Sequence, residues 1–281
     1  MGFKELLLLR VAKHWISGVD LDSAIVDAKK ANSKGMGAVV NFLGEEISDP
    51  AIAESHAAEY LRLQNRMSQE GINGFASVKL TQLGMGADDA GAAERLERIA
   101  ASSERFSQAS WIDMESSRFT EKTLSMYLAS LGRHRNMGIV LQAYLRRSDV
   151  DLPKLLDAGA RIRLVKGAYR ESRDIVYPNR NEVSRSFSRL MEMLFERGEG
   201  FAIATHDSVL VEEAKKLAES KHANFEFEML KGIRDELKED LVKSGYKVSE
   251  YLPYGDRWFA YSKRRITEHP SNIMLLLRSM V

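Results

Sequence analysis

The architecture of the chain follows from the stretch GFASVKLTQLGMGADDAGAAERLERIAASSERF (74–106), which predicts a strand and then a helix. Its first part, GFASVKL (74–80), is a short run of apolar and small side chains bounded by glycine, typical of a strand. Residues 89–106 then place apolar side chains at helical spacing. A further extended run, ASWIDME (109–115), follows directly. Two strands joined through a helix are expected to lie parallel in one sheet.

The same alternation extends in both directions until it makes eight strand–helix units, with no long linker between them. Two short helices, 3–16 and 20–34, precede the first unit. The predicted strands are 35–46, 74–80, 109–115, 138–144, 160–167, 201–206, 224–230 and 246–254, and the helices between them are 51–70, 89–106, 120–134, 149–158, 180–197, 208–220 and 231–244, with an eighth helix after the last strand.

Eight units in 281 residues fit a closed (β/α)8 barrel of the TIM type, in the α/β class. We therefore expect a helical segment over 1–35 and a barrel domain over 36–281. The competing architecture is an open, doubly wound sheet that binds a dinucleotide. Such a sheet has a glycine-rich turn after an early strand, and GMGADD (84–89) lacks the third glycine of that fingerprint. The barrel is the better prediction.

Composition and charge exclude several classes of function. Lys and Arg number 41 against 40 Asp and Glu, so the net charge of +1 gives no basic excess for nucleic acid. The absence of cysteine excludes disulfides, thiol nucleophiles and thiolate metal sites. The six histidines contain no HxxxH pair, so no metal site is expected. The apolar run at 6–9 is too short for a signal peptide, and we expect a soluble, cytoplasmic protein.

Polar side chains occur at the carboxyl ends of nearly all the predicted strands. In (β/α)8 barrels the chemistry gathers at that end, and so many polar groups are costly to bury unless they line a functional site. Arg163 lies inside the fifth strand, on the same alternation as Val165. The side chains at the strand ends are Lys79, Asp113, Glu115, Gln142, Tyr144, Lys166, His206, Asp207, Glu228 and Tyr251.

The last stretch, YLPYGDRWFAYSKRRITE (251–268), predicts a strand that turns into a helix. On that helix Tyr261, Arg264, Arg265 and Glu268 are spaced i, i+3, i+4 and i+7, so they share one face. Arginine binds a carboxylate with two parallel hydrogen bonds, which makes this face a candidate receptor for a small carboxylic acid. A solvent-exposed charged face is the alternative interpretation.

Seven motifs in order along the chain closely resemble the proline dehydrogenase family, in its monofunctional bacterial or archaeal form. Each motif is weak by itself, but the set is specific. They are SVKLTQLG (77–84), IDMES (112–116), VLQAYLRR (140–147), RLVKGAY (163–169), ATHD (204–207), FEFEMLKGIR (225–234) and YLPYGDRWFAYSKRRITEHPSN (251–272).

The resemblance implies a distorted barrel that holds FAD non-covalently at its carboxyl-end mouth. Such an enzyme oxidises L-proline to Δ1-pyrroline-5-carboxylate, the first step of proline catabolism, and passes the electrons to a quinone, which implies a peripheral contact with the inner face of the cell membrane. The alternative from another class is a barrel that binds small molecules, or serves as a partner-dependent subunit, without turnover.

The resemblance also assigns roles to residues of this chain. Lys79, Arg264 and Arg265 would bind the proline carboxylate, and Glu268 would orient the two arginines. Arg163 would lie near flavin N5, and Asp113 would place Lys79 or Arg265. The pyrrolidine ring would contact Leu230, Tyr251 and Tyr261, and the flavin Met114, Gln142, Arg163, Val165, Lys166, Gly167, Ala168, Thr205, His206 and Asp207.

Three positions depart from the family pattern that the motifs follow. Glu228 stands where glutamine is usual, Asp207 where part of the family has asparagine, and Arg170 where many members have an aromatic residue. None of them belongs to the expected carboxylate receptor. They are expected to alter the surroundings of the flavin.

Overall fold

The computed structural model describes residues 12–259, 261 and 262, and in these residues eight parallel strands close into a barrel. Each strand pairs with the next along the chain, and β8 pairs with β1. The prediction of a (β/α)8 barrel is confirmed. The strands are β1 Gly37–Phe42, β2 Gly74–Lys79, β3 Ser110–Asp113, β4 Met137–Gln142, β5 Arg161–Val165, β6 Phe201–Ala204, β7 Phe225–Leu230 and β8 Val248–Tyr254.

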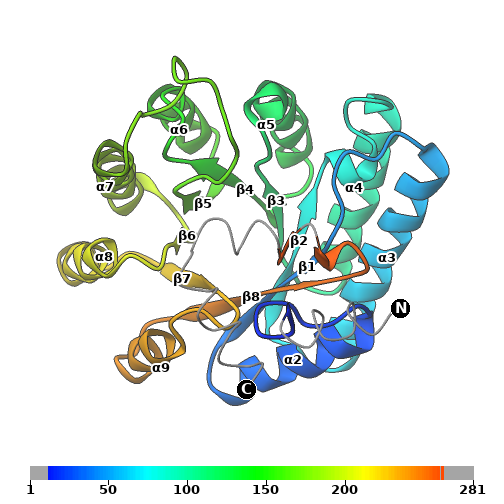
Figure 1. The fold of residues 1–281 in the computed structure, drawn as a ribbon, viewed down its shortest axis with the longest axis horizontal. Coiled ribbons are helices and arrows are strands. Elements are labelled where there is room, and N and C mark those ends of the chain that lie inside the picture. Colours follow the sequence, from blue (N-terminus) through cyan, green and yellow to red (C-terminus); the bar gives the residue numbers. More distant parts are fainter. Residues whose placement is uncertain (1–11, 260, 263–281) are drawn as a thin grey trace.

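Helices surround the barrel on its outside, one after each strand from β1 to β7 (Figure 1). An additional helix, α2 (Leu21–Ser33), contacts the closing strands β8 and β1. The chain turns helical again at residue 258, after β8. The surrounding helices are α3 Pro50–Gln69, α4 Asp89–Arg105, α5 Ser117–Leu131, α6 Ser148–Asp157, α7 Arg180–Arg197, α8 Ser208–Lys221 and α9 Asp235–Lys243, and a short 3-10 helix, η1 Thr81–Leu83, follows β2.

Capping side chains fix where several of these helices begin. Asp49 accepts a hydrogen bond from the N–H of Ala51, and Pro50 occupies the first helical position of α3. Asn179 and Asp207 cap α7 and α8 in the same way. Such caps bind backbone N–H groups that have no partner inside the helix, and each typically contributes about 1 kcal/mol. Local sequence therefore places these boundaries well.

Three predicted boundaries are wrong. Most of the helix expected over 3–16 lies outside the described residues, and its predicted end at residue 16 is wrong, because the chain forms a turn at residues 13–15. The N–H of Ser17 then donates to the carbonyl of Pro253, which holds the chain against β8. The helix expected from 231 begins at Asp235, because Arg234 has a φ of 52°, which no helical residue adopts. The first strand covers Gly37–Phe42 and not the whole of 35–46.

The barrel interior holds a small cluster that is separate from the large core between strands and helices. Val39, Trp111 and Ala202 form this cluster, with Phe75 and Tyr251 packed against it. The indole of Trp111 lies over Gly138, where a Cβ atom would be only 2.2 Å from the ring. The residue opposite Trp111 on β4 therefore has to be glycine.

The segment 12–17 packs beside the mouth of the barrel. Trp15 and Ile16 form a buried cluster with Leu43, Trp258 and Tyr261. The indole N–H of Trp15 donates to Ser262 Oγ at 2.9 Å. The start of the helix after β8 is thus held in place by residues from near the beginning of the chain. In residues 12–259, 261 and 262, no helix is long and apolar enough to cross a bilayer.

Candidate functional site

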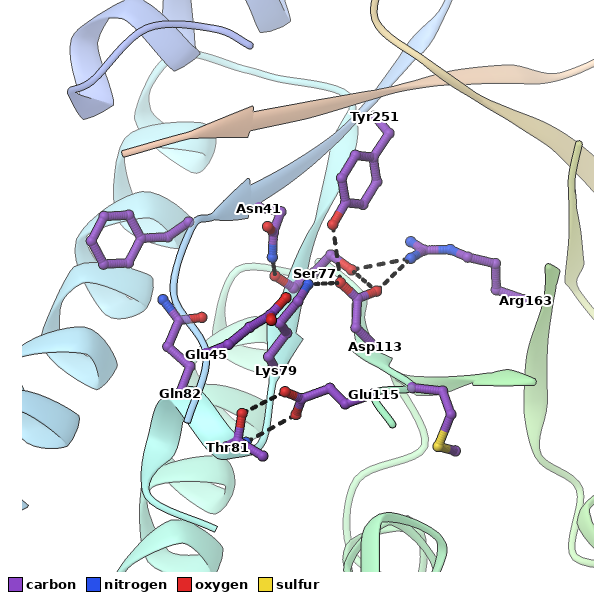
Figure 2. A network of polar contacts seen from close by, with 12 residues as sticks. Asn41, Glu45, Ser77, Lys79, Thr81, Gln82, Asp113, Glu115, Arg163 and Tyr251 are labelled. Atoms are coloured by element: carbon purple, nitrogen blue, oxygen red, sulfur yellow. Dashed lines mark hydrogen bonds and ion pairs between the residues drawn. The ribbon is translucent and has the colours of Figure 1, made fainter. Parts of the chain in front are cut away.

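Asp113, the last residue of β3, binds side chains from three other strands (Figure 2). Its Oδ1 accepts hydrogen bonds from Ser77 Oγ at 2.8 Å and from Arg163 Nη1 at 3.0 Å. Its Oδ2 accepts from Lys79 Nζ and from the Tyr251 hydroxyl, each at 3.0 Å. These residues come from β2, β5 and β8, so parallel pairing around the barrel brings them together. We call these five residues the Asp113 network.

The charges of the Asp113 network stabilise one another in a buried place. Burial alone would raise the pKa of Asp113, but Lys79 and Arg163 hold that pKa below its usual value. Burial would likewise lower the pKa of Lys79, whereas the Asp113 carboxylate raises it well above its usual value. Burial and the nearby carboxylate raise the pKa of the Tyr251 phenol. At neutral pH the site therefore presents a lysine and an arginine that are both charged, and a neutral phenol.

Arg163 also contacts a second carboxylate, on β7. Its Nε lies 2.6 Å from Oε2 of Glu228, although this contact lacks hydrogen-bond geometry. The guanidinium carbon lies 4.8 Å from the Trp111 ring centroid and 5.8 Å from that of Tyr251. The side chain of Arg163 is 3% exposed, and its Nη2 has no hydrogen-bond partner among the described residues. The orientation of Arg163 is thus fixed on both sides. Its buried Nη2 is a donor that a bound molecule could use.

A second group of polar contacts holds the loop that follows Lys79. The Glu115 carboxylate accepts hydrogen bonds from the backbone N–H of Thr81 at 3.0 Å and from the Thr81 hydroxyl. Burial raises the pKa of Glu115 to about 7, against the opposing effect of these donors. The Tyr60 hydroxyl donates to the carbonyl of Ser77 at 2.9 Å. These contacts fix the carboxyl end of β2 and therefore the base of the Lys79 side chain.

The residues expected to contact a flavin lie at the carboxyl ends of β3 to β6. Gln142 donates to the carbonyl of buried Met114 at 3.2 Å, and its buried Oε1 has no hydrogen-bond partner in the described part of the chain. Gly167 has a φ of 106°, and a Cβ there would lie 2.2 Å from the ring of Tyr144. Val165 ends β5, and Ala168 follows Gly167 in the loop.

Other members of this set already make contacts within the protein. Lys166 Nζ donates to Asp207 Oδ2 at 2.7 Å, and Asp207 also caps α8 by accepting from the N–H of Val209. His206 Nε2 accepts from the N–H of Leu230 at 2.9 Å. Buried Thr205 lies directly after β6. The structure therefore gathers the expected flavin residues at one end of the barrel.

The structure describes only some of the residues that were expected to bind the substrate. Leu230 ends β7 and pairs in register with Tyr251 on β8. Tyr261 is buried in the cluster with Trp15 and Trp258. Arg264, Arg265 and Glu268 lie outside the residues that the structure describes. Among the residues described, no three His, Asp or Glu side chains form a group that could hold a metal ion.

Two residues of the site were missed by sequence reasoning. Ser77 donates to Asp113, and Asn41 Nδ2 donates to the carbonyl of Ser77 at 2.8 Å. Ser77 lies two residues before Lys79 on the same strand, so the alternation of β2 could have placed it inside the barrel. Asn41 was also identifiable, as the polar residue within the apolar run GAVVNF.

Comparisons of the sequence with known proteins point to one family. A family model described as proline dehydrogenase matches residues 24–274. Proline dehydrogenases 2 and 1 of Bacillus subtilis (strain 168) are 32% and 33% identical to this chain, covering 99% and 96% of it and 95% and 90% of the relatives. The proline dehydrogenase of Deinococcus radiodurans is 32% identical, covering 96% of this chain and 90% of the relative.

Solved structures of larger proteins share the barrel. Proline utilization A (PutA) from Bdellovibrio bacteriovorus, inactivated by N-propargylglycine, superposes with a TM-score of 0.85 at 25% identity over 91% of this chain. PutA from Bradyrhizobium japonicum gives a TM-score of 0.80 at 20% identity, a likeness of fold, over 92% of this chain. The chain spans only 32% and 30% of these two proteins.

Proposed function

The chain belongs to the proline dehydrogenase family, and from this premise we propose that it oxidises L-proline to Δ1-pyrroline-5-carboxylate with non-covalently bound FAD. The reaction removes a hydride from C5 of proline and a proton from its amine, which leaves for solvent, as the C5=N bond forms. FAD would supply the electron-accepting chemistry and take up the two electrons, so the protein has to bind proline, orient it and supply charge.

The Asp113 network is the observation that supports this function best. Two cations, Lys79 and Arg163, are held at fixed positions by one carboxylate at the mouth of the barrel. Lys79 would bind the proline carboxylate together with Arg264 and Arg265, with Glu268 orienting the two arginines. The pyrrolidine ring would rest against Tyr251, Leu230 and Tyr261. A substrate fixed in this way reacts as if in an intramolecular reaction, which lowers the entropic part of the barrier.

The residues at the carboxyl ends of β3 to β6 fit a flavin. The buried Oε1 of Gln142 and Nη2 of Arg163, both without partners in the described residues, are an acceptor and a donor that suit the polar edge of such a ring system. Arg163 would stabilise the negative charge that develops beside it during the reaction. The remaining contacts would come from Met114, Val165, Lys166, Gly167, Ala168, Thr205, His206 and Asp207.

We further propose that the electrons leave to a quinone, with the protein in the cytoplasm and in peripheral contact with the inner face of the membrane. Anaerobic protein reduced by proline should be reoxidised by a soluble quinone and should co-sediment with vesicles of a bacterial lipid extract. Failure of both measurements would refute this acceptor and this location without affecting proline oxidation.

Anaerobic titration with L-proline tests the main proposal. The purified protein, reconstituted with FAD if necessary, should be yellow and should lose its flavin absorbance when proline is added. Arg264→Met and Arg265→Met should each bind FAD normally but need a much higher proline concentration, because losing a charge-assisted partner costs about 1.5–3 kcal/mol. Arg133→Met, at a surface ion pair with Glu97, is the matched control. A protein that binds no FAD after reconstitution would favour the non-catalytic barrel.

A further inference from the structure

Arg163 lies between two acidic residues, and only one of them belongs to the Asp113 network. Asp113 holds Nη1 from β3, whereas Glu228 reaches Nε from β7. The Glu228 side chain is 2% exposed, so the contact takes place away from bulk water. Two cations and two carboxyl groups thus share one buried space: Lys79, Arg163, Asp113 and Glu228. Whether Glu228 carries a proton decides if their net charge is +1 or zero.

The groups facing Glu228 favour its protonated form. Burial is the largest effect, and repulsion from Glu226 on the same strand and from Asp113 on β3 adds to it. Arg163 on β5 opposes them. The strands on either side of β7 offer no compensating charge, because the residues paired with Glu228 are Ala204 on β6 and Ser249 on β8. Together these effects raise the pKa of Glu228 to about 8.

We propose that Glu228 is a positioning residue whose proton controls how much of the positive charge of Arg163 is available to the reaction. With the proton bound, Arg163 is neutralised by Asp113 alone, and Lys79 gives the group a net positive charge. With the proton lost, the second carboxylate offsets that charge. The proton exchanges with solvent and comes from neither C5 nor the amine of proline. This proposal rests on the proposed function, because it concerns the charge that faces the flavin.

The proton on Glu228 should respond to reduction of the flavin. Negative charge that develops near Arg163 would also raise the proton affinity of Glu228, so reduction should draw up to one additional proton from solvent at pH values above about 8. The midpoint potential of the bound flavin should therefore fall more steeply with pH in the wild-type protein than in Glu228→Gln. Above pH 9, Glu228→Gln should be reduced by proline roughly tenfold faster than wild type, since its neutral amide adds no second negative charge beside Arg163.

A matched variant separates this effect from general damage to the barrel. Glu226 lies two residues earlier on β7, faces the same interior and accepts from Ser249 Oγ at 2.6 Å. Glu226→Gln should keep the steep pH dependence of the potential but shift it to lower pH, because the repulsion that Glu226 exerts on Glu228 is lost. If Glu228→Gln shows the same dependence as wild type, or if Glu226→Gln removes it equally, the proposal is wrong.

Infrared spectroscopy tests the proton without flavin or turnover. Wild-type protein at pH 6 should show carbonyl absorption from buried, protonated carboxylic acids, and one component of it should disappear around pH 8. Glu228→Gln should lack that component. Glu115→Gln, which removes another buried carboxyl group, with a pKa of about 7, should retain it. If Glu228→Gln fails to fold, the spectra of wild type and Glu115→Gln still decide, because absence of a component that disappears around pH 8, or its persistence to pH 10, overturns the proposal. A protein that cannot bind FAD would refute the proposed function and leave this measurement unaffected.

Discussion

Replacing Asp113 with asparagine should destabilise the whole protein as well as the site. The amide keeps the size of the side chain and one acceptor oxygen, but it removes the negative charge that lies 3.0 Å from both Lys79 and Arg163. Arg163 keeps its contact with Glu228, whose pKa falls once the repulsion from Asp113 is gone. Lys79, with a side chain 12% exposed, loses the acidic partner of the one ion pair found for it among the described residues. Breaking a buried ion pair by removing one partner costs about 3–5 kcal/mol.

The expected change is large enough to measure by two methods. For 281 residues, an unfolding entropy of about 2.1 cal/mol/K per residue gives a total near 0.6 kcal/mol/K. A loss of about 4 kcal/mol therefore lowers Tm by about 7 °C. Urea unfolding followed by circular dichroism at pH 7 should give the same loss of unfolding free energy between wild type and variant. Because the pKa of Asp113 lies below its usual value, its contribution is present at neutral pH and fades in acid, so the difference should narrow as the pH falls through that range.

Two further variants identify the cause. Asp149→Asn removes a carboxylate from an exposed pair with Arg189 and should cost no more than about 1 kcal/mol. The double variant Lys79→Met, Asp113→Asn should lose less unfolding free energy than the sum of the losses of the two single variants, because no lysine is left without its acidic partner. If the unfolding free energy of Asp113→Asn at pH 7 lies within about 1 kcal/mol of the wild-type value, the charges of the Asp113 network do not stabilise the fold as described.

Three other predictions follow from the barrel interior and the mouth. Gly138→Ala should cost about 1–3 kcal/mol in urea unfolding, because its Cβ would overlap the Trp111 ring, whereas Gly132→Ala, with open space around it, should not destabilise; equal effects would contradict this packing. Burial raises the pKa of Glu115 to about 7, so its contribution to stability is complete below the usual carboxyl range and is lost as pH rises through 7. Glu115→Gln should remove that dependence of the unfolding free energy, about 3 kcal/mol at most, and an unchanged pH profile would count against it. Because Tyr251 fills the space expected beside C4 of the substrate, kcat/KM should be at least about tenfold higher for proline than for trans-4-hydroxyproline, and equal values would overturn its role.

Much of the fold could be predicted because the sequence signals for each strand and helix lie within or next to that element. Caps such as Asp49 and Asn179 lie next to the helices they begin, and the alternation of strands with helices gives the parallel order. The turn at residues 13–15 was not predicted. Directly after it, Ser17 donates to Pro253, and a contact between residues so far apart leaves no signal in the local sequence.

The sequence predicted which side chains lie at the site, but not which of them bind one another. The ends of the strands indicated Lys79, Asp113 and Tyr251, because the carboxyl ends of parallel strands meet at one edge. That Asp113 binds all of them depends on the register between strands, which no single strand encodes. The contact between Glu228 and Arg163 was missed for the same reason: alternation gives the side of the strand but not the level in the barrel.

The closure of the barrel through β8 and β1 has a consequence for how the chain folds during synthesis. Val39 on β1 pairs with Tyr251 on β8, so one edge of the sheet has no partner until almost the whole described chain has left the ribosome. The hydrogen bonds that join Trp15 to Ser262 and Ser17 to Pro253 also cannot form until that point. Contacts of such long range slow folding and leave strand edges exposed to other nascent chains. Polypeptides halted before β8 should therefore be the ones that recruit chaperones and aggregate, even though seven of the eight strands are already made.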